Sequence, residues 1–216
     1  MYLIIYRQVA PPTPHYNFPM IPSFTIKGIL PPYMGDPTAA FKMNPYRTTM
    51  QSFVQMFGYT PERIKIIQGL LDYRAELLSL GLTGFQWLSG SFVEKVELIR
   101  NRPPGDVDVI SIINRPEQFA SFVAWSEFID EGSRPGELLF DARAMKKEFC
   151  CDAYTIDMNE PGDAIVESTR FWIGLFTHQK LSDAWKGIVA VELDAQQDVA
   201  ARSMLASLVT ALPTTV

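Results

Sequence analysis

The spacing of hydrophobic residues predicts one long helix in the first half of the chain. Isoleucine and leucine side chains recur three and four positions apart between residues 61 and 80, which is the period of a helix with one buried face. Thr60 can cap this helix, Pro61 suits its first turn, and Gly81 can end it. These signals together predict a helix over residues 61–80.

Strands and helices alternate along the rest of the chain. Short runs of apolar and β-branched residues predict strands, and the segments between them have helical spacing. The predicted strands cover residues 85–88, 106–113, 149–158 and 187–193. The predicted helices cover residues 91–99, 116–129, 138–147, 168–178 and 194–212. This alternation predicts an α/β or α+β fold, with a mixed sheet flanked by helices.

Residues 1–37 are expected to form an extended, proline-rich arm. They carry eight of the sixteen prolines, and proline lacks a backbone donor and restricts the residue before it. Within this arm, the sequence permits a short strand around residues 23–30. Residues 38–216 are predicted to be a single domain, with its core at about 60–160 and a C-terminal part of helices and a strand at 165–216.

Charge and composition narrow the class of protein. The formal net charge is −5, which argues against a general DNA-binding protein. A protein that holds long nucleic acid through its phosphates usually needs a basic face. Apolar runs stay shorter than the roughly 18–20 residues of a membrane span, and the start lacks the longer apolar stretch of a secretory signal. The adjacent Cys150 and Cys151 are interpreted as reduced thiols, because a bond between them needs a strained turn. We therefore expect a cytoplasmic protein without membrane insertion.

Two carboxylates mark the beginning of the strand predicted at residues 106–113. Asp106 and Asp108 alternate with valines, so both carboxylates project from one face of the strand. Like charges at that spacing repel each other, and a shared cation relieves the repulsion. Mg²⁺ prefers such hard oxygen ligands and keeps part of its shell for substrate phosphates. The pair predicts a site for Mg²⁺ or Mn²⁺.

A third carboxylate is expected from the strand at residues 149–158. Asp152 lies inside that strand, and if the two strands are neighbours it completes a cluster with Asp106 and Asp108. Such a cluster can hold two metal ions across a transferring phosphoryl group. Asp157 is the alternative third ligand, although it falls on the opposite face and nearer the strand end.

Four further residues are candidates for contact with a nucleotide. Gly90 lets the backbone approach a phosphate closely, and the Ser91 hydroxyl, at the start of a predicted helix, can add a hydrogen bond. His178 and Lys186 can grip a triphosphate. The alternative for His178 is that it stabilises the end of a helix, as cations do there.

Other side chains near these candidates keep two interpretations open. Lys146 and Lys147, just before the strand with Asp152, can contact phosphate or be a solvated basic pair. Tyr154 shares a strand face with Asp152, so it can pack on the sheet or stack on a base or sugar.

The order of these features resembles a known superfamily. A Gly-Ser pair, a helix, an Asp-x-Asp strand and a third Asp on a later strand are similar to DNA polymerase beta-type nucleotidyltransferases. Residues 87–94 and 102–109 further resemble a small uncharacterised bacterial family within it, and residues 176–178 and 185–187 are similar to its later landmarks. The resemblance covers roughly residues 20–205. The gap between Ser91 and Asp106 is longer than is common in the superfamily.

The resemblance implies a nucleotidyltransferase palm and a two-metal reaction. Gly90 and Ser91 would contact the triphosphate, Asp106 and Asp108 would bind both Mg²⁺ or Mn²⁺ ions, and Asp152 would bind the catalytic one. The protein would transfer a nucleoside monophosphate from an NTP or dNTP to a hydroxyl acceptor, for example to make a nucleotide or oligonucleotide signal in anti-phage defence, or within a toxin–antitoxin pair. The alternative is a non-catalytic or protein-modifying antitoxin-type module that acts through a protein partner. The acceptor, a protein partner and a homo-oligomer all stay open.

Overall fold

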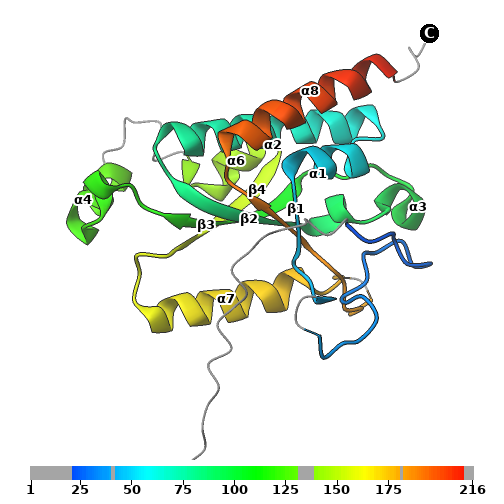
Figure 1. Ribbon diagram of the computed structural model, residues 1–216, viewed down its shortest axis with the longest axis horizontal. Helices are drawn as coiled ribbons and strands as arrows, with labels where there is room; N and C mark the ends of the chain where they lie inside the picture. The colour runs from blue at the N-terminus through cyan, green and yellow to red at the C-terminus, as the bar shows by residue number, and fades with distance from the viewer. Residues whose placement is uncertain (1–20, 40–41, 131–138, 181, 212–216) are drawn as a thin grey trace, which may run out of the picture.

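The computed structural model describes residues 21–39, 42–130, 139–180 and 182–211. Within them, five strands form one mixed sheet with helices on both faces (Figure 1). The strands follow the order β1-β5-β2-β3-β4 across the sheet, and their bounds are β1 Tyr46–Thr48, β2 Thr83–Ser89, β3 Val107–Asn114, β4 Cys151–Asp157 and β5 Val189–Glu192. This confirms the predicted fold class, a mixed sheet flanked by helices.

The pairing of β3 with its two neighbours sets the geometry of the sheet where the acidic residues lie. β2 and β3 are antiparallel, and Ser89 pairs with Asp108. β3 and β4 are parallel, and Asp108 pairs with Asp152. Because side chains alternate along each strand, residues paired in this way project from the same face.

Four helices cover one face of the sheet and enclose the larger core (Figure 1). They are α1 Met50–Phe57, α2 Pro61–Ser79, α6 Ala142–Phe149 and α8 Ala195–Ala211. Val107 and Val109 point into this core, as the alternation in the sequence predicted. The Arg74 side chain is fully buried there, where it pairs with Asp198 and donates to Gln86 and to the Glu192 carbonyl oxygen.

The opposite face is covered by α7 Gly162–Phe176, which packs on a smaller core (Figure 1). Trp172, Ile173 and Phe176 of this helix contact Ile110 and other apolar side chains of the sheet. Short elements complete the description: η2 Gly90–Val93, α3 Val96–Arg100, η3 Glu117–Phe119 and α4 Phe122–Asp130.

Two predicted helices are broken into shorter pieces. The single helix predicted over residues 91–99 is wrong, because Glu94 has an extended backbone (φ −120°, ψ 161°) between η2 and α3. The helix predicted over 116–129 is also interrupted, and its two parts are η3 and α4. Burial of the Glu94 side chain, described below, explains the first break.

The N-terminal part differs more from the sequence prediction. Residues 1–20 lie outside the described residues. Residues 23–30 form no strand; they contribute one bridge, between Ile29 and Glu94. β1 and α1, both before residue 60, were not predicted. None of the described helices is long and apolar enough to cross a membrane.

Candidate functional site

The predicted carboxylates meet on the α7 face of the sheet, where β3 and β4 begin. Asp108 and Asp152 are paired residues of adjacent parallel strands, so their side chains lie next to each other on this face. Asp106 lies one residue before β3. Its Oδ2 atom is 2.6 Å from Lys146 Nζ, and Asp152 Oδ2 is 3.3 Å from the same nitrogen. Three carboxylates from two neighbouring segments therefore converge.

Asp157, the alternative third carboxylate, lies elsewhere. It is the last residue of β4, at the opposite end from Asp152. Its carboxylate forms an ion pair with Arg115, whose side chain is almost fully buried and which also pairs with Glu160. Asp157 therefore has a structural partner of its own, and the geometry favours Asp152 as the third member of the cluster.

Lys146 is the cation that Asp106 and Asp152 share. It lies in the last turn of α6, and its hydrogen bond to Asp106 raises the pKa of the ammonium. Among the described residues, no group of three or more His, Cys, Asp or Glu side chains has an arrangement that could hold a metal ion. The donors nevertheless suit Mg²⁺ chemically, because they are carboxylate oxygens and two of them already converge on one positive charge.

Asp108 is the most perturbed carboxyl of the cluster. Burial, followed by the nearby negative charge of Asp106, raises its pKa to about 6. The positive charge of Lys186 opposes this shift. The carboxyl group is thus held in a place where its charge is unfavourable unless a cation approaches.

Gly90 brings the backbone against this carboxylate. Its φ of +77° belongs to the left-handed region, and a Cβ atom there would lie only 2.7 Å from Asp108 Cγ. A side chain at this position would therefore collide with Asp108 as well as strain the turn. In the structure, the absence of a side chain at Gly90 makes room for the Asp108 carboxylate. The contact of Gly90 with phosphate stays a prediction.

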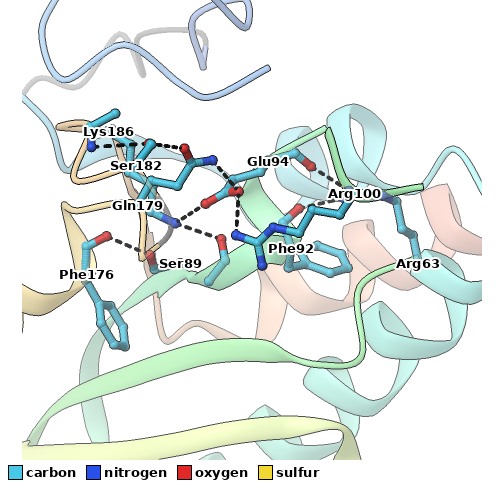
Figure 2. Close-up of polar contacts among 11 residues, drawn as sticks. Arg63, Ser89, Phe92, Glu94, Arg100, Phe176, Gln179, Ser182 and Lys186 are labelled. Carbon is cyan, nitrogen blue, oxygen red and sulfur yellow. Dashed lines mark hydrogen bonds and ion pairs between the residues drawn. The ribbon is translucent and has the colours of Figure 1, made fainter. Parts of the chain in front are cut away.

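Lys186 is buried and paired rather than free in the cavity. Its Nζ atom donates to the Gly90 carbonyl oxygen at 2.9 Å and pairs with Glu94 Oε1 at 2.8 Å. Glu94 also accepts from Gln179 Nε2 at 3.0 Å, and the Arg100 guanidinium lies 3.7 Å from it (Figure 2). The contact with Gly90 fixes the glycine turn, so Lys186 acts on the site as an anchor and as a fixed positive charge.

A cavity of about 730 Å³ unites the predicted residues. All seven of them line it: Gly90, Ser91, Asp106, Asp108, Asp152, His178 and Lys186. His178 is exposed, and its Nδ1 atom lies 2.7 Å from the Gly174 carbonyl oxygen. The structure thus brings together residues that are far apart in sequence, while their chemical roles stay a prediction.

Several other residues of this cavity were not among the predicted site residues. Arg100 and Gln179 surround Glu94, and an apolar wall comes from α7. No local spacing signal points to Arg100 or Gln179, because their common partner is distant in sequence. The run of large apolar residues in α7 is a sequence signal for an apolar cavity wall, although burial of one helix face explains such a run equally well.

The comparison with protein families gave one match to most of the chain. A model described as a family of unknown function, DUF6932, matches residues 22–192. Comparisons with curated proteins and with solved structures found no match. The matched range includes the complete carboxylate cluster, Lys146 and the glycine turn. By this match, the chain belongs to the DUF6932 family.

Proposed function

We propose that the protein is a metal-dependent nucleotidyltransferase that transfers a nucleoside monophosphate from an NTP or dNTP to a hydroxyl acceptor. The observation that carries this proposal is the convergence of three carboxylates beside a glycine turn in one cavity. Phosphoryl transfer needs positioning and charge neutralisation more than covalent chemistry by the protein. Oxygen ligands for a cation and a backbone turn open to phosphate meet both needs.

Each group has a defined task in this reaction. Asp106, Asp108 and Asp152 would hold Mg²⁺ or Mn²⁺, which would supply charge neutralisation of the phosphates and a lowered pKa of the acceptor hydroxyl. The glycine turn and the Ser91 hydroxyl orient the triphosphate. The acceptor oxygen bonds to the α-phosphorus while the bond to the bridging oxygen breaks. Pyrophosphate leaves with that electron pair, and the hydroxyl proton is released.

Lys146 has to move for this reaction to proceed. Its ammonium lies between Asp106 and Asp152, so it competes with a metal ion for the same oxygens. About half of the Lys146 side chain is exposed (52%), which leaves it room to turn toward solvent or toward phosphate in the cavity. Lys146 thus offsets one negative charge of the cluster when no divalent cation is present.

The direct test uses labelled NTPs and dNTPs with Mg²⁺ or Mn²⁺. Products are resolved as free nucleotide, oligomer or modified protein, and pyrophosphate is measured. The double variant Asp106→Ala/Asp108→Ala should stay folded and release no pyrophosphate. The control is Glu148→Ala, which removes an exposed carboxylate from the neighbouring helix α6 and should keep wild-type activity. Equal pyrophosphate release by the double variant and the wild type would defeat the proposal.

The Lys146 bridge also favours a second candidate function. Lys146 pairs with two of the three carboxylates and so offsets part of their charge without a metal, as expected of a non-catalytic, antitoxin-type module that binds a partner protein. Such a module should bind its partner equally well with or without Asp106 and Asp108. Nucleotide consumption that depends on Mg²⁺ or Mn²⁺ separates the two candidates.

A further inference from the structure

One wall of the cavity is apolar and aromatic. It consists of Tyr154 from β4 and Phe171, Trp172 and Leu175 from α7, which we call the aromatic wall. Phe171 is 53% exposed and Leu175 is 55% exposed. Large apolar side chains that stay exposed beside charged groups are typical of a binding surface.

The rings of the aromatic wall are held in place by contacts with one another. The ring centroids of Tyr154 and Trp172 are 4.5 Å apart, and those of Phe171 and Trp172 are 4.9 Å apart, edge to face. Trp172 also contacts Phe176 of the smaller core. Because Trp172 is anchored there, the rings of Tyr154 and Phe171 are already held in place. A ligand that stacks on them therefore loses little binding free energy to ordering these side chains.

The aromatic wall lies next to the charged part of the same cavity. Tyr154 follows Asp152 by two residues on one face of β4, and His178 and Lys180 follow the end of α7. A ligand that spans the cavity would therefore meet flat apolar rings at one part and carboxylates and cations at another. A planar ring system joined to a polyphosphate has this combination of properties.

We infer that the aromatic wall stacks the base of the nucleotide whose phosphates face the carboxylate cluster and the glycine turn. This inference rests on the proposed function and names the part of the cavity that recognises its substrate. Stacking on an aromatic ring accepts every base, because each base has a π face. The aromatic wall therefore binds nucleosides as a class, and discrimination among bases needs other contacts.

The experiment compares two ligands that share the phosphates and differ in the base. The full chain is titrated by calorimetry with ATP and with inorganic tripolyphosphate, both in Ca²⁺. Phe171→Ala should weaken ATP binding about tenfold or more, as loss of one stacking contact does, and leave tripolyphosphate binding unchanged. The matched control is Phe122→Ala, because Phe122 is 69% exposed on α4 and does not line the cavity.

The outcomes separate this inference from the proposed function. Unchanged ATP binding by Phe171→Ala, or an equal loss for both ligands, overturns the aromatic wall as a base site while the nucleotidyltransferase proposal stands. Wild-type protein that binds tripolyphosphate as tightly as ATP also overturns it. Wild-type protein that binds neither ligand defeats the proposed function, and the inference falls with it. Circular dichroism melting curves verify that each variant is folded.

Discussion

Replacing Asp108 with asparagine is expected to stabilise the metal-free protein at neutral pH. The folded structure raises the pKa of this carboxyl from 3.8 to about 6, through burial and the charge of Asp106. The folded state therefore holds the proton more tightly than the unfolded chain does. As pH rises through this interval the unfolded state is increasingly favoured, so the ionised Asp108 lowers the free energy of unfolding at pH 7 and above.

The size of the effect follows from the pKa difference. A shift of about two pKa units corresponds to about 3 kcal/mol, at 1.36 kcal/mol per unit. Asparagine has a similar shape and no charge, so Asp108→Asn should recover up to about 3 kcal/mol at pH 8. For a protein of this length that gain raises Tm by roughly 6–12 °C. The gain should shrink to about half at pH 5 and to about 0.5 kcal/mol at pH 4.

The assay is urea or thermal unfolding in EDTA from pH 4 to pH 8. Asp157→Asn is the matched control, since Asp157 lies at the other end of the paired strands and balances the buried Arg115. Its replacement should destabilise the protein by about 1–3 kcal/mol, because Arg115 loses one of its two carboxylate partners and keeps Glu160. The same chemical change should thus have opposite signs at two sites.

Two results would refute this reasoning. One is a neutral or destabilising effect of Asp108→Asn at pH 8. The other is a stabilisation that stays constant as the pH falls to 4, because a pH-independent gain cannot come from relief of the Asp108 charge.

Two further predictions concern the neighbours of this carboxylate. Lys146→Met should lower the free energy of unfolding of the metal-free protein by about 1 kcal/mol, a value limited by solvent screening of its half-exposed ammonium. It should also tighten Mn²⁺ binding several-fold in calorimetry, because a competing cation is removed. Weaker Mn²⁺ binding, or an equal effect of Lys147→Met, would contradict this. Gly90→Ala should destabilise the fold by about 2 kcal/mol through its positive φ and its contact with Asp108, and should reduce pyrophosphate release at least tenfold. Gly105→Ala, whose added Cβ meets nothing within 4 Å, should change neither property, and normal activity of Gly90→Ala would argue against a tight turn at the site.

Local signals in the sequence were sufficient for the strongest elements. The long helix predicted over residues 61–80 is α2, with Thr60 as its cap and Pro61 in the first turn. β3 was predicted from its β-branched run, and the alternation of aspartate and valine correctly assigned their faces. In each of these cases the burial pattern repeats within a few residues.

The unpredicted helix α1 also has a local signal in the sequence. α1 begins after Thr49, whose side chain accepts a hydrogen bond from the backbone of Ser52. Its buried residues are spaced as in any amphipathic helix, namely Met50, Phe53, Val54 and Phe57. The helix is short and follows the proline-rich stretch, so its pattern covers only about two turns.

Contacts between distant residues explain what could not be predicted. Glu94 leaves the helical conformation and buries its carboxylate against Lys186 and Gln179, and both partners are more than 80 residues away. A buried ion pair outweighs the modest helical preference of a single glutamate. The three aspartates could be named from sequence, whereas the pairing of Lys146 with Asp106 and Asp152 depends on how α6 is placed beside β3 and β4.

The position of β5 between β1 and β2 has a consequence for the order in which the protein can assemble on the ribosome. Among the described strands, β1 pairs with β5 alone, and β5 separates it from β2. Until residue 192 has emerged, the nascent chain has an unpaired β1 and an open edge along β2, which is a template for pairing with other chains. The Lys186 anchor of the glycine turn arrives with the same segment. A stalled translation product shorter than this is therefore expected to aggregate before it can form the cavity.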